Sequence, residues 1–356
     1  MLKLEYKDYT LDFKFEAGTS RGVLIKHSVF FIKIFDDKNP EVYGIGEAAP
    51  LPNLSPERIS DVEEAFKTLS KKIQDFNLPA HEEEVFYIVD SLVSRELPSV
   101  RMAMETALFD LLNGGKRLIF SNDYYIGNFK IPINGLIWMG DEAFMKKQIE
   151  EKLEAGYKCI KMKIGAIDFE KELALLKMLR ESSKDLIIRV DANGAFDTMH
   201  VFRHLNSLDM YDIHSIEQPI MAGQMEAMQL ISKRSPVPIA LDEELITVTD
   251  PVQKRELLRF INPDYIILKP TLLGGFGSTL EWIKIAEDIG IGWWITSALE
   301  SNISLNAIAQ FVSNFPNLSY QGLGTGQLYH NNIDSPLVIE NATLSYHPDL
   351  NWGSVF

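Results

Sequence analysis

Cysteine is almost missing from this chain of 356 residues, because Cys159 is the only one. A single cysteine excludes an internal disulfide and any zinc site that needs several thiolates. Cys159 lies within a short apolar segment, where cysteine usually packs as a small hydrophobic residue. We therefore expect a buried, unreactive thiol.

Long apolar segments and an excess of positive charge are also missing. No run reaches about 18 apolar residues, the length that spans a bilayer. The opening residues, MLKLEYKDYTLDF, carry scattered charges, unlike a signal peptide. The formal net charge of −15 opposes attraction to nucleic acid or anionic lipid. We expect a cytoplasmic protein with neither a nucleic-acid nor a membrane partner.

The first 125 residues have the pattern of an α+β unit. Short alternating runs before about residue 45 are separated by glycines and by the turn DDKNP, which predicts antiparallel strands. Helical spacing follows over residues 57–76, with a start near Ser55, Pro56 and Glu57, and again over residues 99–115. Strands followed by helices predict a separate domain, residues 1–125.

Residues 126–325 alternate short apolar strands with amphipathic helices. The expected strands are IPINGL, CIKMK, LIIRVD, IHSIE, PIALD, YIILK, WWITS and LSYQG. No GxGxxG motif follows the first strand, and the strand spacing is nearly constant. The pattern therefore predicts an α/β fold with a closed (β/α)₈ barrel of the TIM type rather than an open doubly wound sheet.

Five consecutive strands of this barrel end in a charged residue. These residues are Lys163, Asp191, Glu217, Asp242 and Lys269. One carboxylate after a strand often caps the next helix, but five charged residues in succession make that explanation weak. Catalytic residues of such barrels lie at the carboxyl ends of the strands, so we expect these five to form the site.

The three acids among them predict a metal site. Asp191, Glu217 and Asp242 follow adjacent strands, and converging carboxylates repel unless a cation or a proton lies between them. A ligand set of oxygen atoms alone favours Mg²⁺ over Zn²⁺, with Mn²⁺ as a substitute.

The lysines predict proton transfer. Lys161 and Lys163 share one face of a strand, and Lys269 follows the strand diametrically opposite in an eight-membered ring. The charges of Lys161 and of the cation should lower the pKa of Lys163, so that it can act as a base. A metal and a lysine together suggest abstraction of a proton next to the carboxylate of a small-molecule substrate.

These residues resemble the enolase superfamily, specifically its muconate-lactonizing subgroup. The matching motifs are KMK at 161–163, DAN at 191–193, EQP at 217–219, DE at 242–243 and KP at 269–270. The resemblance covers nearly the whole chain and implies that residues 1–125 cap the barrel of residues 126–325, and that residues 326–356 return to the cap.

The same resemblance implies roles for individual residues. Asp191, Glu217 and Asp242 would be the Mg²⁺ ligands, and the catalytic residues would be Lys163, Lys269 and the auxiliary Lys161. Capping loops would be residues 18–23 and 48–54. The expected substrate contacts are Arg189, Asn193, Ser297, Glu300, Ser20 and Arg21.

Two further segments narrow the resemblance. TSALESNISLNAIAQ at 296–310 and QGLGTGQLY at 321–329 look like those of the o-succinylbenzoate synthases, lyases of menaquinone biosynthesis. This implies syn-dehydration of 2-succinyl-6-hydroxy-2,4-cyclohexadiene-1-carboxylate through an enediolate. Lys163 would remove the α-proton and then assist loss of hydroxide from the same face, while Lys269 would stabilise the enediolate.

The alternatives are a dipeptide epimerase or N-acylamino acid racemase, which use the same lysines, and a non-catalytic metabolite-binding barrel. Similar dipeptide epimerases carry Asp-x-Asp at the end of the eighth strand, where this chain has Gln321 to Gly324. The ESN at 300–302, where ESS is commoner, departs from the family pattern. A pair of opposed lysines argues against a barrel that only binds a metabolite, because binding a carboxylate needs no base. Family members form homo-oligomers, so this chain could form one too, and the sequence does not give its oligomeric state.

Overall fold

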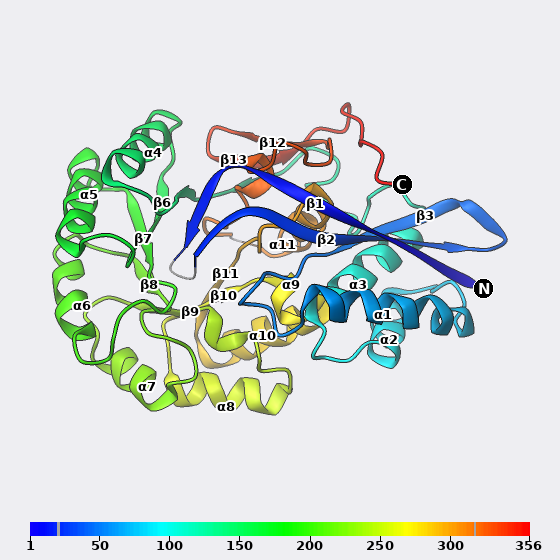
Figure 1. Ribbon diagram of the computed structural model, residues 1–356, viewed down its shortest axis with the longest axis horizontal. Coiled ribbons are helices and arrows are strands. Elements are labelled where there is room, and N and C mark those ends of the chain that lie inside the picture. Colours follow the sequence, from blue (N-terminus) through cyan, green and yellow to red (C-terminus); the bar gives the residue numbers. More distant parts are fainter. Residues whose placement is uncertain (20–21, 317) are drawn as a thin grey trace.

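The computed structural model describes residues 1–19, 22–316 and 318–356. They form a modified TIM barrel with an N-terminal cap, which confirms the expected fold class (Figure 1). Cys159 is buried, and burial raises the pKa of its thiol to about 11, as expected for an unreactive cysteine. In the described residues, no helix is long and apolar enough to cross a bilayer.

The cap is built on an antiparallel sheet with strand order β1-β2-β3. Its strands are β1 (Leu2–Thr19), β2 (Gly22–Asp36) and β3 (Asn39–Ala48). Alternate residues of β2 enter different apolar clusters, since Ile32 packs in one and Phe31 in the other. Both faces of the sheet are therefore covered by other parts of the molecule.

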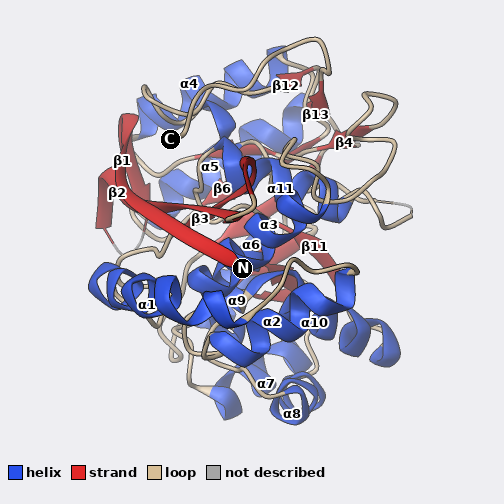
Figure 2. Ribbon diagram, turned by 90° about the vertical axis from the view of Figure 1, so that its right-hand side faces the viewer, coloured by secondary structure: helices blue, strands red, loops and turns tan. Residues whose placement is uncertain are grey.

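Three helices follow this sheet; the first and the third pack against it, and the second packs against the third (Figure 2). They are α1 (Ile59–Lys72), continued by the 3₁₀ turn η1 (Ile73–Asp75), α2 (Glu82–Leu92) and α3 (Pro98–Leu112). The expected start near residues 55–57 was wrong, because the Asp61 carboxylate accepts a hydrogen bond from the backbone N–H of Arg58 and α1 begins at Ile59. The α2 helix was not predicted. The α3 helix approaches β3 closely, since a Cβ on Gly46 would lie 2.0 Å from the carbonyl oxygen of Ala103.

In the described chain, seven parallel strands form the barrel sheet in sequence order. They are β5 (Gly135–Ile137), β6 (Cys159–Lys163), β7 (Ile187–Asp191), β8 (Ser215–Glu217), β9 (Ile239–Leu241), β10 (Tyr265–Leu268) and β11 (Gly292–Ile295). The expected eighth strand is reduced to two parallel bridges, from Gln321 to Ile133 and from Gly322 to Thr296. These bridges close the ring between its first and seventh strands.

Helices and short turns connect the strands. They are α4 (Glu142–Glu154), α5 (Phe169–Ser182), α6 (Val201–Asp209), α7 (Met225–Arg234), η2 (Glu243–Leu245), α8 (Pro251–Ile261), α9 (Pro270–Leu273), α10 (Gly275–Ile289), α11 (Asn302–Val312) and η3 (Thr325–Gln327). Several begin where a side chain accepts a backbone N–H, as Asp141 does from Phe144 and Ser301 from Ile303.

The first expected barrel strand, residues 131–136, was wrong as a single element. Its first part belongs to β4 (Lys130–Pro132), which pairs antiparallel with β13 (Thr343–Tyr346), itself paired with β12 (Leu337–Glu340). Of β4 and β5, only β5 belongs to the seven-stranded barrel sheet. Alternation of apolar residues marks a strand but does not say which strand it pairs with.

The C-terminal segment also contacts the cap. Tyr329 bridges to Phe13, and the side chain of Asn331 bonds to the backbone of Thr10 and Asp12 on β1. The expected division at residues 125 and 325 stays a prediction.

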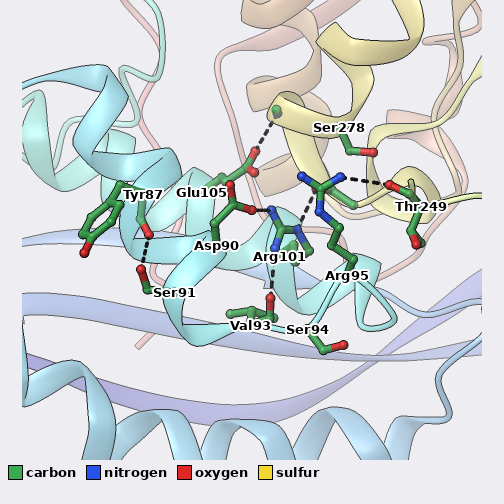
Figure 3. Close-up of polar contacts among 12 residues, drawn as sticks. Tyr87, Asp90, Ser91, Val93, Ser94, Arg95, Arg101, Glu105, Thr249 and Ser278 are labelled. Carbon is green, nitrogen blue, oxygen red and sulfur yellow. Dashed lines mark hydrogen bonds and ion pairs between the residues drawn. The ribbon is translucent and has the colours of Figure 1, made fainter. Parts of the chain in front are cut away.

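Two buried acids of the cap are held at the starts of barrel helices. Glu47 of β3 accepts hydrogen bonds from the N–H (2.8 Å) and hydroxyl (2.7 Å) of Ser301, and from the N–H of Ser304 (3.2 Å). Glu105 of α3 accepts from the N–H groups of Phe276 and Gly277 at the start of α10, near the arginine Arg101 (Figure 3). The unpaired N–H groups of a helix start thus bind cap carboxyls, which joins the two parts of the molecule.

Candidate active site

A cavity of about 330 Å³ opens at the carboxyl ends of the barrel strands. Lys161, Lys163, Asp191, Lys269 and Ser297 lie on its polar side. Apolar side chains cover much of the rest, namely Phe15, Leu51, Leu54, Leu136, Trp138, Phe144, Ala298, Leu299 and Leu328. Part of the expected capping loop 48–54 thus reaches the cavity. Ser20 and Arg21, expected as substrate contacts, lie outside the described residues.

Strand register brings the charged strand ends together. Lys163 of β6 pairs in register with Asp191 of β7, and Asp191 pairs with Glu217 of β8. Asp242 directly follows β9, and Lys269 directly follows β10. In parallel strands, residues at equal height on one face point the same way, so these side chains meet at the mouth.

The lysines and acids of the mouth contact one another directly. The Nζ of Lys161 lies 2.6 Å from Oε2 of Glu217 and 2.9 Å from Oδ2 of Asp191. The Nζ of Lys163 lies 3.1 Å from the same Oδ2, and Lys269 contacts Asp242. All of these side chains are buried, so each charge depends on its partners.

The two opposed lysines differ in pKa. Burial lowers the pKa of Lys163, the Asp191 charge offsets this in part, and the Lys161 charge lowers it further. Burial also lowers the pKa of Lys269, but the charges of Asp242 and Glu217 outweigh it, so that its pKa is raised. The expected lowering for Lys163 is confirmed in direction, although burial rather than Lys161 is its main cause.

The pKa values of two acids at the mouth, Glu217 and Asp191, are shifted in opposite directions. Burial raises the pKa of Glu217, and the nearby Asp191 charge raises it further. Burial also favours a protonated Asp191, but the charges of Lys161 and Lys163 outweigh it and hold its pKa well below the usual range. In the part of the chain that the structure describes, no three His, Cys, Asp or Glu side chains are grouped as a ready metal site. The buried Oε1 of Glu217 accepts no hydrogen bond from the described residues, and the Nζ of Lys269 lies 3.9 Å from it.

Asn193 and Ser297 lie on the cavity lining. Asn193 accepts a hydrogen bond from Nζ of Lys163 (2.7 Å) and donates one to Glu243 (2.9 Å). Ser297 donates to Oε2 of Glu300 (2.5 Å) and accepts from the hydroxyl of Thr325 (2.8 Å). Both side chains are therefore held in fixed orientations at the mouth.

Glu300 and Arg189 lie off the lining. Glu300 is fully buried and accepts hydrogen bonds from Ser297 and Thr271, which places it behind the cavity wall. The guanidinium of Arg189 lies 3.8 Å from the ring centroid of Trp294 and donates to the backbone oxygen of Tyr320 (2.8 Å). Neither position supports the expected contact with substrate.

Several lining residues were not predicted from the sequence. Trp138 has its ring centroid 5.9 Å from Nζ of Lys163, and Phe15 packs against Trp138 with ring centroids 5.8 Å apart. Continuing the alternation of β5 by two residues from Leu136 would have placed Trp138 inside the barrel. No comparable pattern in the sequence predicts Lys152 of α4 on the lining, because it has the position of an ordinary lysine on a helix.

Comparison with known proteins agrees with this geometry. Residues 144–349 match the family described as enolase C-terminal domain-like. The o-succinylbenzoate synthase of Desulfotalea psychrophila is 43% identical over 96% of this chain and 98% of its own length.

Solved structures agree as well. The crystal structure of MenC from Desulfotalea psychrophila superposes with a TM-score of 0.86 at 40% identity, covering 97% of this chain and 99% of that one. The L-Ala-D/L-Glu epimerase from Bacillus subtilis shares the fold, with a TM-score of 0.83 at 19% identity, covering 99% of this chain and 96% of that one. The chain belongs to the enolase superfamily.

Proposed function

We propose that this protein is an o-succinylbenzoate synthase, a lyase that removes water from 2-succinyl-6-hydroxy-2,4-cyclohexadiene-1-carboxylate. One observation carries the proposal: two lysines with opposite pKa shifts line one cavity from opposite sides of the ring, with carboxylates between them. The similarity to the Desulfotalea psychrophila enzyme over nearly the whole chain supports it.

Lys163 is the proposed base. Its lowered pKa increases the neutral fraction of the amine, which can then take the proton from the carbon next to the ring carboxylate. The electron pair of that C–H bond passes into the carboxylate and forms an enediolate. Asn193 accepts a hydrogen bond from Nζ of Lys163 and so holds the amine at the cavity.

Lys163 then acts as an acid. Its ammonium group returns the proton to the hydroxyl on the same face, the C–O bond breaks, water leaves and the ring becomes aromatic. Lys163 ends as the neutral amine with which it began. Lys269 keeps its proton because its pKa is raised, so it remains a cation beside the negative charge of the enediolate.

Asp191, Glu217 and Asp242 are the proposed ligands of a divalent metal, Mg²⁺ with Mn²⁺ as a substitute. They fit such an ion because they offer oxygen atoms alone, and because the buried Oε1 of Glu217 accepts no hydrogen bond from the described residues. When bound, the ion supplies positive charge beside the substrate carboxylate.

The cavity wall fits this substrate. A volume of about 330 Å³ lies within the usual range for small ligands. Leu136, Trp138 and Phe144 give the ring an apolar wall, which also keeps water from the enediolate. Asn193 and Ser297 are the proposed polar contacts.

The test is a product assay in D₂O with Mg²⁺. We expect conversion of the cyclohexadiene carboxylate to o-succinylbenzoate, with no deuterium entering an added dipeptide or N-acylamino acid. Deuterium in those compounds without dehydration would instead assign the protein as an epimerase or racemase. Gly322 and Gly324, which line the cavity, offer no carboxylate for a peptide amine, in agreement with the dehydratase.

A further inference from the structure

Leu299 has a left-handed backbone at the wall of the cavity. Its φ angle is 66°, in a region that bulky side chains rarely adopt. The residue lies shortly after β11 and lines the cavity together with Ser297. A strained backbone persists only when the surrounding structure holds it, and such residues gather at functional sites. The contacts that hold Leu299 are therefore candidates for a role in the site.

Hydrogen bonds hold both backbone groups of Leu299. Its N–H donates to Oγ of Ser297 (3.1 Å). Its carbonyl oxygen accepts from the hydroxyl of Tyr329 (2.5 Å) and lies 3.0 Å from Nδ1 of His27. Both of these side chains are buried. His27 belongs to β2 of the cap, and Tyr329 to the C-terminal segment, so two distant parts of the chain hold one carbonyl group.

The imidazole of His27 lies between two carbonyl groups. Its Nε2 is 3.2 Å from the oxygen of Pro50, in the capping loop 48–54. Burial lowers the pKa of His27, and the contacts with the two carbonyls raise it in part. A neutral imidazole carries one N–H. The shorter contact places this hydrogen on Nδ1, from which it is donated to Leu299.

The side chain of Leu299 packs against the same capping loop. It contacts the apolar cluster that contains Leu51 and Ala298, and Leu51 and Leu54 line the cavity beside it. A negative φ would turn the Cβ of Leu299 in another direction, and this part of the wall would be lost. The wall covers the bound ring and keeps water from the enediolate.

We propose that His27 and Tyr329 are positioning residues for substrate binding. Together they hold the carbonyl group of Leu299, and so keep its side chain on the cavity wall against the capping loop. This inference rests on the proposed function, because the cyclohexadiene carboxylate is the ligand that the wall would bind.

Three variants of His27 test which ring nitrogen matters. His27→Leu removes both nitrogens. His27→Asn places an amide N–H at the δ position, within reach of Leu299, whereas His27→Gln places it at the ε position, toward Pro50. Steady-state dehydration assays of the full-length protein with Mg²⁺ measure KM and kcat, and thermal unfolding measures the melting temperature.

We expect His27→Leu to raise KM for the cyclohexadiene substrate about tenfold, as for loss of one buried hydrogen bond. The value of kcat should change little, because the wall binds the substrate and takes no part in proton transfer. His27→Asn should restore KM nearly to the wild-type value, and His27→Gln should not.

Tyr329→Phe should raise KM in the same way, and Tyr9→Phe is its matched control. The hydroxyl of Tyr9 donates to the carbonyl oxygen of Asn331 (2.8 Å), which is a bond of the same kind between the cap and the C-terminal segment. Tyr9 lies off the cavity lining. Tyr9→Phe should therefore leave KM unchanged, even where the melting temperature falls.

An unchanged KM in both His27→Leu and Tyr329→Phe, whatever their melting temperatures, would overturn the inference and leave the proposed function intact. A KM for His27→Asn as high as that of His27→Leu would also overturn it, because the hydrogen bond to Leu299 would then not be the one that matters. An equal rise in KM for Tyr9→Phe and Tyr329→Phe would show a general loss of stability instead. A wild-type protein that does not dehydrate the substrate would overturn the proposed function, and the inference with it.

Discussion

Two regions of this protein hold buried acidic side chains in different ways. At the mouth, Asp191 and Glu217 contact lysine ammonium groups from neighbouring strands. At the junction of cap and barrel, Glu47 and Glu105 accept hydrogen bonds from neutral backbone N–H groups.

The pKa values follow this difference. Burial raises the pKa of Glu47 to about 7, with the hydrogen bonds from Ser301 offsetting it in part. Burial raises that of Glu105 to about 8 against the charge of Arg101. Lysine charges instead hold Asp191 well below its usual range. Two lysine partners thus keep Asp191 ionised, whereas the pKa of Glu217 beside it is raised to about 8, in the same direction as those of the acids that join two parts of the fold.

The largest effect is expected from Lys163→Ala. Loss of the base should reduce kcat about 10²–10⁴-fold, with little change in the melting temperature, because Asp191 keeps its contact with Lys161. Steady-state dehydration assays measure it, with Lys147→Ala as the exposed control. Undiminished turnover would remove Lys163 from the mechanism.

The next effect concerns the acids of the mouth. EDTA should stop the dehydration and added Mg²⁺ should restore it. Glu217→Gln should raise the Mg²⁺ concentration for half-maximal activity about 100-fold, because one anionic ligand is lost. Magnesium titrations measure it. Glu105→Gln, at the junction, is the control and should need the same Mg²⁺ concentration as wild type. If Glu217→Gln also needed the same Mg²⁺ concentration as wild type, Glu217 would not be a metal ligand.

At the junction the expected effect is on stability. Glu47→Ala should lower the free energy of unfolding by about 2–4 kcal/mol, because the N–H groups of Ser301 and Ser304 lose a buried acceptor. Urea unfolding measures this, with the exposed cap residue Glu96 changed to alanine as the control. Equal stability of the two variants would show that Glu47 does not join cap and barrel.

The smallest effect is a pH dependence. Between the ordinary pKa of 4.5 and the folded value of about 8, folded Glu105 keeps a proton that the unfolded chain has lost. The stability that Glu105 gains from this proton is therefore fully present below pH 4.5. It declines as the pH rises to about 8. Glu105→Gln should remove at least about 1.4 kcal/mol of this decline, the value of a one-unit shift. Parallel unfolding curves of the two proteins from pH 5 to 8 would contradict the raised pKa.

The sequence predicted the mouth better than the rest because strand periodicity carries the information. Alternation placed Lys161 and Lys163 on one buried face, and regular strand spacing placed Asp191 and Glu217 beside them. Periodicity does not identify the strand with which a residue pairs, so Ile131 and Pro132 were assigned to the barrel although they pair with β13.

Side-chain direction was harder to predict. The position of Arg189 on a barrel strand did not reveal that it stacks on Trp294 away from the cavity. Lys152 packs against Gly135 from α4, and only the packing of α4 against β5 reveals this position.

The contacts between Phe13 and Tyr329, and between Ile133 and Gln321, join segments far apart along the chain. During synthesis the outer edge of β1 stays uncovered until residues near 330 have been made. The barrel cannot close before residue 321 has left the ribosome. Contacts of such long sequence separation form slowly and leave an exposed strand edge in the meantime. Ribosome-bound chains that end before residue 321 should therefore be the form of this protein that aggregates most readily.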